Sequence, residues 1–283
     1  MKIAFIGKGG SGKSTVSWLA TQLLVAENRK VLAIDADHNM DLVSLLGQKI
    51  ESETTTMHRH ADDFRIAVGQ KEDKRWHEIV LDGRSLPTFT LEPKDSYTSQ
   101  VTLPVSDSIE LIAVGLGATD VLFSDRCAHG HSASLKFYLP LLDEGENTDV
   151  VIDGVAGADM MNYGLFLGAD AIVVVVEPHQ NSVRVLEQVN DIAERTGAFL
   201  FVVINKVGTN PTLADQIEDD WKEKILARIP TDLALLSYDM KSLAQETILE
   251  GKNMIRKLRE YTPQKNSLER LRSFEKQKAQ ARA

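Results

Sequence analysis

A glycine-rich segment near the start of the chain places the strongest constraint on its fold. Residues 7–14 read Gly-Lys-Gly-Gly-Ser-Gly-Lys-Ser, directly after the apolar run 2–6 and directly before the helical pattern 15–24. This order of strand, glycine-rich turn and helix N-terminus is the context that a phosphate-binding loop requires. Glycine lacks a Cβ, so the backbone can approach a phosphate closely, and the amides that open the helix point at the anion. The segment predicts a nucleoside triphosphate site.

The side chains of this loop have separate expected roles. The Lys13 amine is expected to reach the β- and γ-phosphates, and the Ser14 hydroxyl is expected to bind Mg²⁺. The other predicted nucleotide contacts in this stretch are Gly7, Lys8, Gly9, Gly10, Ser11, Gly12 and Thr15.

Apolar, β-branched runs alternate with helical patterns along the rest of the chain. The expected strands are 2–6, 30–35, 109–114, 149–153, 171–176, 198–204 and 225–229, and the expected helices are 14–27, 133–142, 181–196, 213–221, 242–250 and about 254 onward. A run such as 171–176 is apolar on both faces, which is typical of a parallel strand covered on both sides. We predict an α/β fold, doubly wound, with a mostly parallel sheet and helices on both faces. Ligands of such sheets bind at the carboxyl ends of the strands.

Two stretches depart from this alternation. Residues 47–108 lack sustained periodicity and are expected to form an irregular surface insertion, with room for a small hairpin that joins 65–68 to 78–81. Residues 264–283 are rich in Lys, Arg, Glu and Gln, so a polar, solvated and fraying C-terminal helix is expected there. The predicted organisation is one P-loop domain over 1–263, followed by this tail.

Composition restricts the partners that the chain can have. The 283 residues carry a net charge of −9, which argues against a broad nucleic-acid footprint. One cysteine excludes a disulfide framework and suits a reducing compartment. We expect a cytoplasmic protein without a signal peptide, because Met1 leads directly into the first strand, and without membrane or nucleic-acid partners.

Lys8 lies between the first glycines of the loop. The string Lys-Gly-Gly-x-Gly-Lys-Ser resembles the deviant Walker A signature of the MinD/ParA/nitrogenase-iron-protein class of ATPases. The resemblance implies a homodimer in which Lys8 reaches the nucleotide of the facing subunit, so that hydrolysis depends on dimerisation. Such a lysine stabilises charge on the transferring phosphoryl group. The alternative is that Lys8 is a solvated loop residue.

Acidic residues that follow two strands match the switch segments of the same class. Asp35 and Asp37 resemble its Asp-x-Asp segment, which implies that Asp37 orients the attacking water and that Asp35 is structural or belongs to the Mg²⁺ shell. His38 stands where the class commonly has proline. Asp153 and Gly157 resemble the Asp-x-x-x-Gly switch, whose acid holds a Mg²⁺-bound water and whose glycine amide senses the γ-phosphate. Asx-turn residues at a strand exit are the alternative for Asp35 and Asp37.

Two later segments resemble the nucleoside contacts of the class. Asn205 ends a strand at the place where the class has an asparagine that contacts adenine, and the loop Pro230-x-Asp232 matches the segment on the other side of the base. Lys206 is followed by Val-Gly, so the guanine-reading motif Asn/Thr-Lys-x-Asp is missing. The expected nucleotide is therefore ATP rather than GTP.

The region from 110 to 142 resembles a narrower group, the CooC-type ATPases that assist nickel insertion into carbon monoxide dehydrogenase. Those proteins carry a Cys-x-Cys pair where this chain has Cys127 and His129. A thiolate with an imidazole suits Ni²⁺ or Zn²⁺, and a two-fold dimer would double the ligand set. The alternative is a buried free cysteine near surface histidines. The resemblance implies a Mg²⁺-dependent ATPase that dimerises on nucleotide and assists the maturation of a client metalloenzyme.

Two other functions within the class are weighed against this one. A ParA/MinD-like positioning or partitioning ATPase remains the alternative, although the acidic charge disfavours it. An electron donor of the iron-protein type needs two cysteines per subunit for a shared [4Fe–4S] cluster, and this chain has one.

Overall fold

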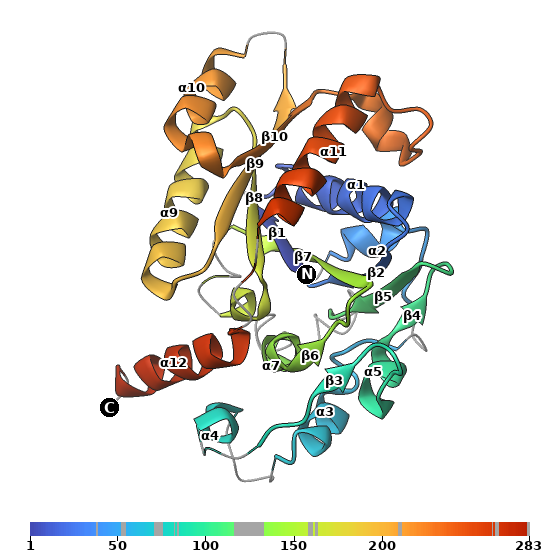
Figure 1. Ribbon diagram of the computed structural model, residues 1–283, viewed down its shortest axis with the longest axis vertical. Helices are drawn as coiled ribbons and strands as arrows, with labels where there is room; N and C mark the ends of the chain where they lie inside the picture. Colours follow the sequence, from blue (N-terminus) through green and yellow to red (C-terminus); the bar gives the residue numbers. More distant parts are fainter. Residues whose placement is uncertain are drawn as a thin grey trace.

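A central sheet organises the part of the chain that the computed structural model describes, which is residues 1–37, 39–51, 55–70, 76–81, 83, 85–115, 133–157, 161, 164–208, 211–261, 263 and 266–281. The strand order is β10-β9-β8-β1-β7-β2-β5-β4 (Figure 1). Its strands are β1 (Lys2–Gly7), β2 (Lys30–Asp35), β4 (Leu103–Pro104), β5 (Ile109–Ala113), β7 (Thr148–Ala156), β8 (Ala171–Val176), β9 (Leu200–Val207) and β10 (Ile225–Pro230). All neighbours pair in parallel except β4 with β5. The predicted doubly wound, mostly parallel sheet is confirmed.

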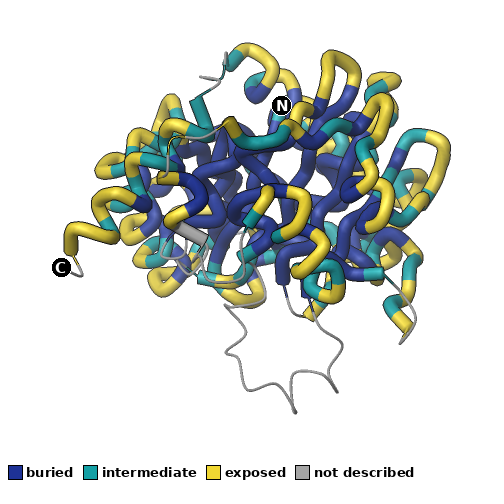
Figure 2. The backbone as a smooth tube through the Cα atoms, turned by 90° about the horizontal axis from the view of Figure 1, so that it is seen from below, coloured by how far each residue is buried: buried dark blue, intermediate teal, exposed yellow. Residues whose placement is uncertain are grey.

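Helices cover both faces of this sheet, and the strands are buried between them (Figure 2). Ile3 and Phe5 of β1 point into one apolar layer, and Ala4 and Ile6 point into the other, as the two-residue period of a strand requires. The first layer includes α1 (Lys13–Ala26), α2 (Asp41–Leu45) and α11 (Gln245–Glu260). The second includes α7 (Ala133–Leu141), α9 (Gln180–Thr196), α10 (Thr212–Trp221) and the 3₁₀ turn η2 (Leu165–Gly168). Two further 3₁₀ turns are η3 (Lys222–Lys224) and η4 (Leu233–Ser237).

The insertion is more regular than the sequence predicts. The expected hairpin between 65–68 and 78–81 is wrong, because both segments lie in or beside short helices. The insertion contains α3 (Ala61–Ala67), α4 (Trp76–Leu81), α5 (Ser96–Val101) and β3 (Phe89–Thr90), which pairs in parallel with β6 (Leu142–Asp143). The ring of Phe64 packs 5.4 Å from that of Phe89 and 5.1 Å from that of Tyr97, measured between centroids. Burial of these aromatics anchors helices too short to be stable alone.

The C-terminal region also differs from expectation. One helix, α11, replaces the two predicted at 242–250 and from 254, and it ends at Glu260. A second helix, α12 (Ser267–Gln280), packs against α4, α7 and η2 (Figure 1). Leu271 is 1% exposed and Glu275 is 5% exposed. The tail is therefore packed against the domain, because its few apolar side chains lie on one face of the helix. The expectation of a solvated helix is wrong in this respect.

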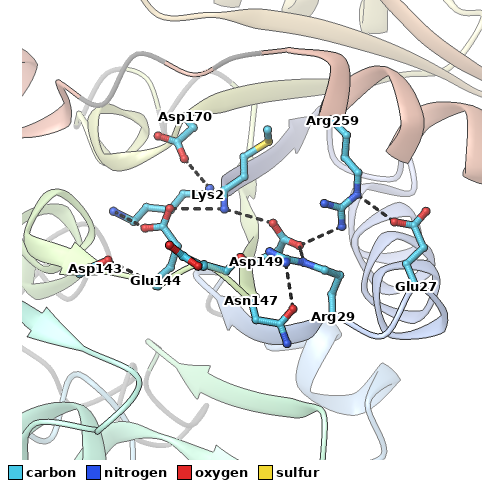
Figure 3. Close-up of polar contacts among 12 residues, drawn as sticks. Lys2, Glu27, Arg29, Asp143, Glu144, Asn147, Asp149, Asp170 and Arg259 are labelled. Carbon is cyan, nitrogen blue, oxygen red and sulfur yellow. Dashed lines mark hydrogen bonds and ion pairs between the residues drawn. The ribbon is translucent and has the colours of Figure 1, made fainter.

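A polar network fixes the amino edge of the sheet, opposite the edge where ligands of such folds bind (Figure 3). Asp149 of β7 accepts a hydrogen bond from Arg29 Nε at 2.8 Å and one from the Met1 amine at 3.2 Å. Arg259 of α11 lies 3.4 Å from the same carboxylate and 2.9 Å from Glu27. Burial opposes ionisation of Asp149, but Arg29 and the Met1 amine together outweigh it and lower the pKa of the carboxyl. The network joins β7, β1, α11 and the end of α1.

Candidate nucleotide site

The glycine-rich segment forms a tight loop between β1 and α1. Gly10 and Gly12 have φ angles of 85° and 86°, in the left-handed region that favours glycine. The Ser11 N–H donates to the Lys8 carbonyl at 3.0 Å, which closes a turn. A Cβ on Gly12 would lie 2.3 Å from Asn205 Nδ2, so this position has no room for a side chain. The backbone has the shape that the sequence predicts for a phosphate-binding loop.

Carboxylates from two strand ends gather around Lys13. The Lys13 amine lies 2.9 Å from Asp37 Oδ2 and 4.0 Å from Asp153 Oδ1. All three side chains are less than 10% exposed, at 9%, 2% and 0% respectively. Burial opposes the charge of Lys13, but the attraction of Asp153 and Asp37 outweighs it, so the pKa of the amine is raised. The structure thus brings three of the four predicted catalytic residues together.

Asp35 shapes the segment that carries Asp37. Its carboxylate accepts hydrogen bonds from the backbone N–H groups of Asp37 at 3.1 Å and Val43 at 3.0 Å. Burial, together with the charge of Asp153, raises the pKa of Asp35 to about 8. Asp35 is thereby a structural acid that ties the exit of β2 to α2.

Among the described residues, the Asp153 carboxylate keeps one oxygen without a hydrogen-bond partner, as a ligand of a hydrated metal ion requires. Burial raises the pKa of Asp153 to about 6, although Lys13 opposes this shift. Its Oδ1 lies 3.4 Å from Ser17 Oγ, and its buried Oδ2 has no hydrogen-bond partner among the described residues. Two carboxylates, those of Asp37 and Asp153, face one lysine, so the site carries excess negative charge. A hard divalent cation such as Mg²⁺, which prefers oxygen ligands, fits this donor set together with Ser14.

At the other end of the loop, Asn205 contacts the backbone of the loop itself. Its Nδ2 donates to the Ser11 carbonyl at 2.8 Å. Its Oδ1 is buried without a hydrogen-bond partner in the described part of the chain, which leaves an acceptor for a ligand N–H. Pro230 pairs with Val207 at the neighbouring strand end, so it lies beside the same edge.

Asp232 and Gly157 are engaged with the protein. Asp232 accepts from the Ala234 and Ala244 N–H groups, both at 2.9 Å, so it caps η4 and fixes the start of α11. The Gly157 N–H donates to the Gly7 carbonyl at 2.8 Å, so contact with a γ-phosphate requires an exchange of partners. Both residues lie in the segments where the sequence predicts nucleotide contacts.

The predicted transition-metal ligands Cys127 and His129 lie outside the described residues, as does His38. Within the described ranges, no cluster of three or more His, Cys, Asp or Glu side chains has a geometry suited to a metal ion. In the same part of the chain, none of the helices combines the length and apolar character needed to span a bilayer.

Sequence reasoning missed Lys206. Its amine donates to the Gly10 carbonyl and to Glu177 Oε1, both at 2.5 Å. The only available signal was its position next to Asn205, because the contact joins residues 196 positions apart.

Comparison with known proteins gives a consistent result. Residues 3–243 match the CobQ/CobB/MinD/ParA nucleotide binding domain. An uncharacterized ATP-binding protein of Methanocaldococcus jannaschii is 28% identical over 237 residues, 83% of this chain and 90% of that protein. The carbon monoxide dehydrogenase accessory protein CooC of Rhodospirillum rubrum is 26% identical over 248 residues, 86% and 89% of the two chains. The structure of the septum site-determining protein MinD from Pyrococcus horikoshii, complexed with Mg-ADP, superposes with a TM-score of 0.62 at 17% identity, covering 91% and 96%.

Proposed function

This chain belongs to the CobQ/CobB/MinD/ParA family and is a P-loop ATPase, and we propose that it dimerises on nucleotide and assists the maturation of a metalloenzyme. The observation that carries the nucleotide chemistry is the set of buried acids around Lys13, where one Asp153 oxygen has no hydrogen-bond partner among the described residues. The CooC relative, an accessory protein of carbon monoxide dehydrogenase, supports the maturation role.

The ion pair of Lys13 with Asp37 connects binding to catalysis. The triphosphate lies on the backbone amides that precede α1, helped by the positive end of the helix dipole. Lys13 then exchanges Asp37 for the β- and γ-phosphates, which frees the Asp37 carboxylate to orient a water molecule. That water attacks the γ-phosphorus in line, and the bond from this phosphorus to the β,γ-bridging oxygen breaks to give ADP and phosphate. Ser14 and Asp153 would hold Mg²⁺, which would supply positive charge to the phosphates.

We assign Lys8 to the nucleotide of the facing subunit in a homodimer. Lys8 is partly exposed on the turn that the Ser11 N–H closes. In the same subunit, the acids at the site outnumber their cation, because Lys13 alone lies near both Asp37 and Asp153. In the proposed dimer, Lys8 of the facing subunit adds a second cation that stabilises the negative charge of the transition state.

The metal role rests on Cys127 and His129. A thiolate and an imidazole from each subunit supply four ligands of the kind that Ni²⁺ and Zn²⁺ accept. In the proposed function this site, shared across the dimer, delivers a metal to a client metalloenzyme. Titration of dialysed protein with Ni²⁺ or Zn²⁺ tests this, and binding that the Cys127→Ala/His129→Ala double variant leaves unchanged would remove the site.

A ParA/MinD-like positioning or partitioning role is the alternative. A plasmid partition protein of Borrelia burgdorferi bound to AMPPNP superposes with a TM-score of 0.60, but at 21% identity this likeness concerns the fold. A salt-dependent shift of DNA, or ATP-dependent co-sedimentation with liposomes, would favour this alternative.

The dimer is tested with two lysine variants and light scattering. Lys8→Ala should bind ATP as the wild type does, yet fail to dimerise with a nonhydrolysable analogue and lose hydrolysis. Lys13→Ala should lose affinity for the nucleotide itself. A Lys8→Ala variant that still dimerises and hydrolyses ATP at the wild-type rate refutes the role of this lysine in the partner's site.

A further inference from the structure

Two consecutive side chains at the exit of β9 hold two consecutive carbonyls of the phosphate-binding loop. Asn205 Nδ2 donates to the Ser11 carbonyl, and Lys206 Nζ donates to the Gly10 carbonyl. The Lys206 amine also pairs with Glu177 at the end of β8. One amine therefore connects the loop to the ends of two neighbouring strands.

The direction of a carbonyl determines the direction of the next amide. A trans peptide is planar, and its C=O and N–H groups point to opposite sides. With the Gly10 carbonyl turned toward Lys206, the Ser11 N–H faces away from it and donates to the Lys8 carbonyl, which closes the turn that carries Lys8. The bond from Lys206 thus orients the peptide on which this turn depends.

The backbone of Lys206 is strained in a way that a surface ion pair does not explain. Its φ is 56°, a left-handed conformation that L-residues other than glycine rarely adopt. Such conformations persist where surrounding contacts demand them, and they concentrate at functional sites. A Cβ on Gly12 would lie 3.8 Å from Lys206 Cε, so the lysine stem passes close to the loop.

We propose that Lys206 is a positioning residue for ATP binding, which holds the phosphate-binding loop in its anion-accepting conformation through the Gly10 carbonyl. Glu177 orients the amine, and the strained backbone aims the side chain back over the loop. The role rests on the nucleotide site described above and adds a residue to it. Lys206 acts on the loop and does not act in the chemical step, so it affects the capture of ATP rather than its cleavage.

The test measures KM and kcat for ATP hydrolysis, together with the Kd of a fluorescent ATP analogue. Lys206→Met should raise KM and Kd about tenfold while kcat stays within twofold of the wild type. Glu177→Gln, which leaves the bond to Gly10 in place, should raise both by two- to threefold. Lys222→Met is the matched control, because Lys222 is also an exposed lysine with a positive φ, of 25°, outside the nucleotide site. It should bind and hydrolyse ATP as the wild type does.

Lys206→Gly separates the amine from the strain. Glycine accepts the positive φ without cost, so weakened ATP binding in this variant supports the amine, and wild-type binding overturns the proposal. The melting temperature of nucleotide-free Lys206→Met should stay within about 2 °C of the wild type, since the side chain is 47% exposed. A fall in kcat together with a fall in the melting temperature would indicate a general structural role and overturn the proposal. Wild-type protein that fails to bind ATP would instead refute the nucleotide site itself.

Discussion

The buried ion pair between Lys136 of α7 and Glu275 of α12 gives the sharpest test of how the C-terminal helix is held. The two side chains are 10% and 6% exposed. Removing one partner of a buried pair costs about 3–5 kcal/mol, because the other charge stays buried without compensation. In Glu275→Gln the amide oxygen still accepts a hydrogen bond, worth about 1 kcal/mol. The Phe274 ring, with its centroid 5.0 Å from the Lys136 amine, keeps its cation–π contact in the variant, so the amine retains a partner and the cost lies at the lower end of that range.

We therefore expect Glu275→Gln to lower the free energy of unfolding by about 2 kcal/mol, measured by urea denaturation with circular dichroism. Glu260→Gln is the matched control, because its pair with Arg256 is exposed and should contribute less than about 0.5 kcal/mol. The double variant Lys136→Met/Glu275→Leu should be within about 1 kcal/mol of the wild type, since apolar side chains can replace a buried pair. Equal effects of Glu275→Gln and Glu260→Gln would refute a structural role for the buried pair.

Three other outcomes follow from the packing and the charges. Gly168→Ala should destabilise the protein by about 1–3 kcal/mol, because its Cβ would lie 2.3 Å from a side chain of α7; an unchanged thermal melt would contradict this. Gly12→Ala should weaken ATP binding at least tenfold in a calorimetric titration, because the new Cβ would displace Asn205; wild-type affinity would show that the loop tolerates it. The pKa values of Asp35, about 8, and Asp153, about 6, lie above those of an unfolded chain. Their stabilising contribution is therefore complete below about pH 4 and is lost as the pH rises. The free energy of unfolding without nucleotide should fall between pH 6 and pH 8, and a rise in urea denaturation would refute the assignment.

The parts of the fold that could be predicted are those whose geometry is encoded locally. The loop at 7–14 specifies its own backbone, because the left-handed angles at Gly10 and Gly12 demand glycine. The apolar composition of a strand such as 171–176 indicates that it is buried on both faces. Acids at strand exits, such as Asp37 and Asp153, meet because parallel strands end at one edge.

The parts that could not be predicted depend on contacts between distant segments. The polarity of α12 indicates a solvated helix, and only the packing against α7 shows why Leu271 and Glu275 are buried. The short helices of the insertion lack a clear period of their own, and their stability comes from aromatic contacts around Phe64. Such information lies in the tertiary structure and not in any one segment.

The contacts of Lys13 also explain why one lysine and three acids can share a buried site. The acids are close enough to repel one another, and burial adds to the cost of ionising Asp35 and Asp153. Lys13 offsets part of that cost only while it lies near Asp37 and Asp153. When its amine moves to a triphosphate, the acids lose their cation and the nucleotide brings more negative charge. A divalent cation, and under the proposed function the partner's lysine, must then supply the missing positive charge. Under the proposed function, the same arrangement that binds ATP in one subunit would therefore favour assembly with a second.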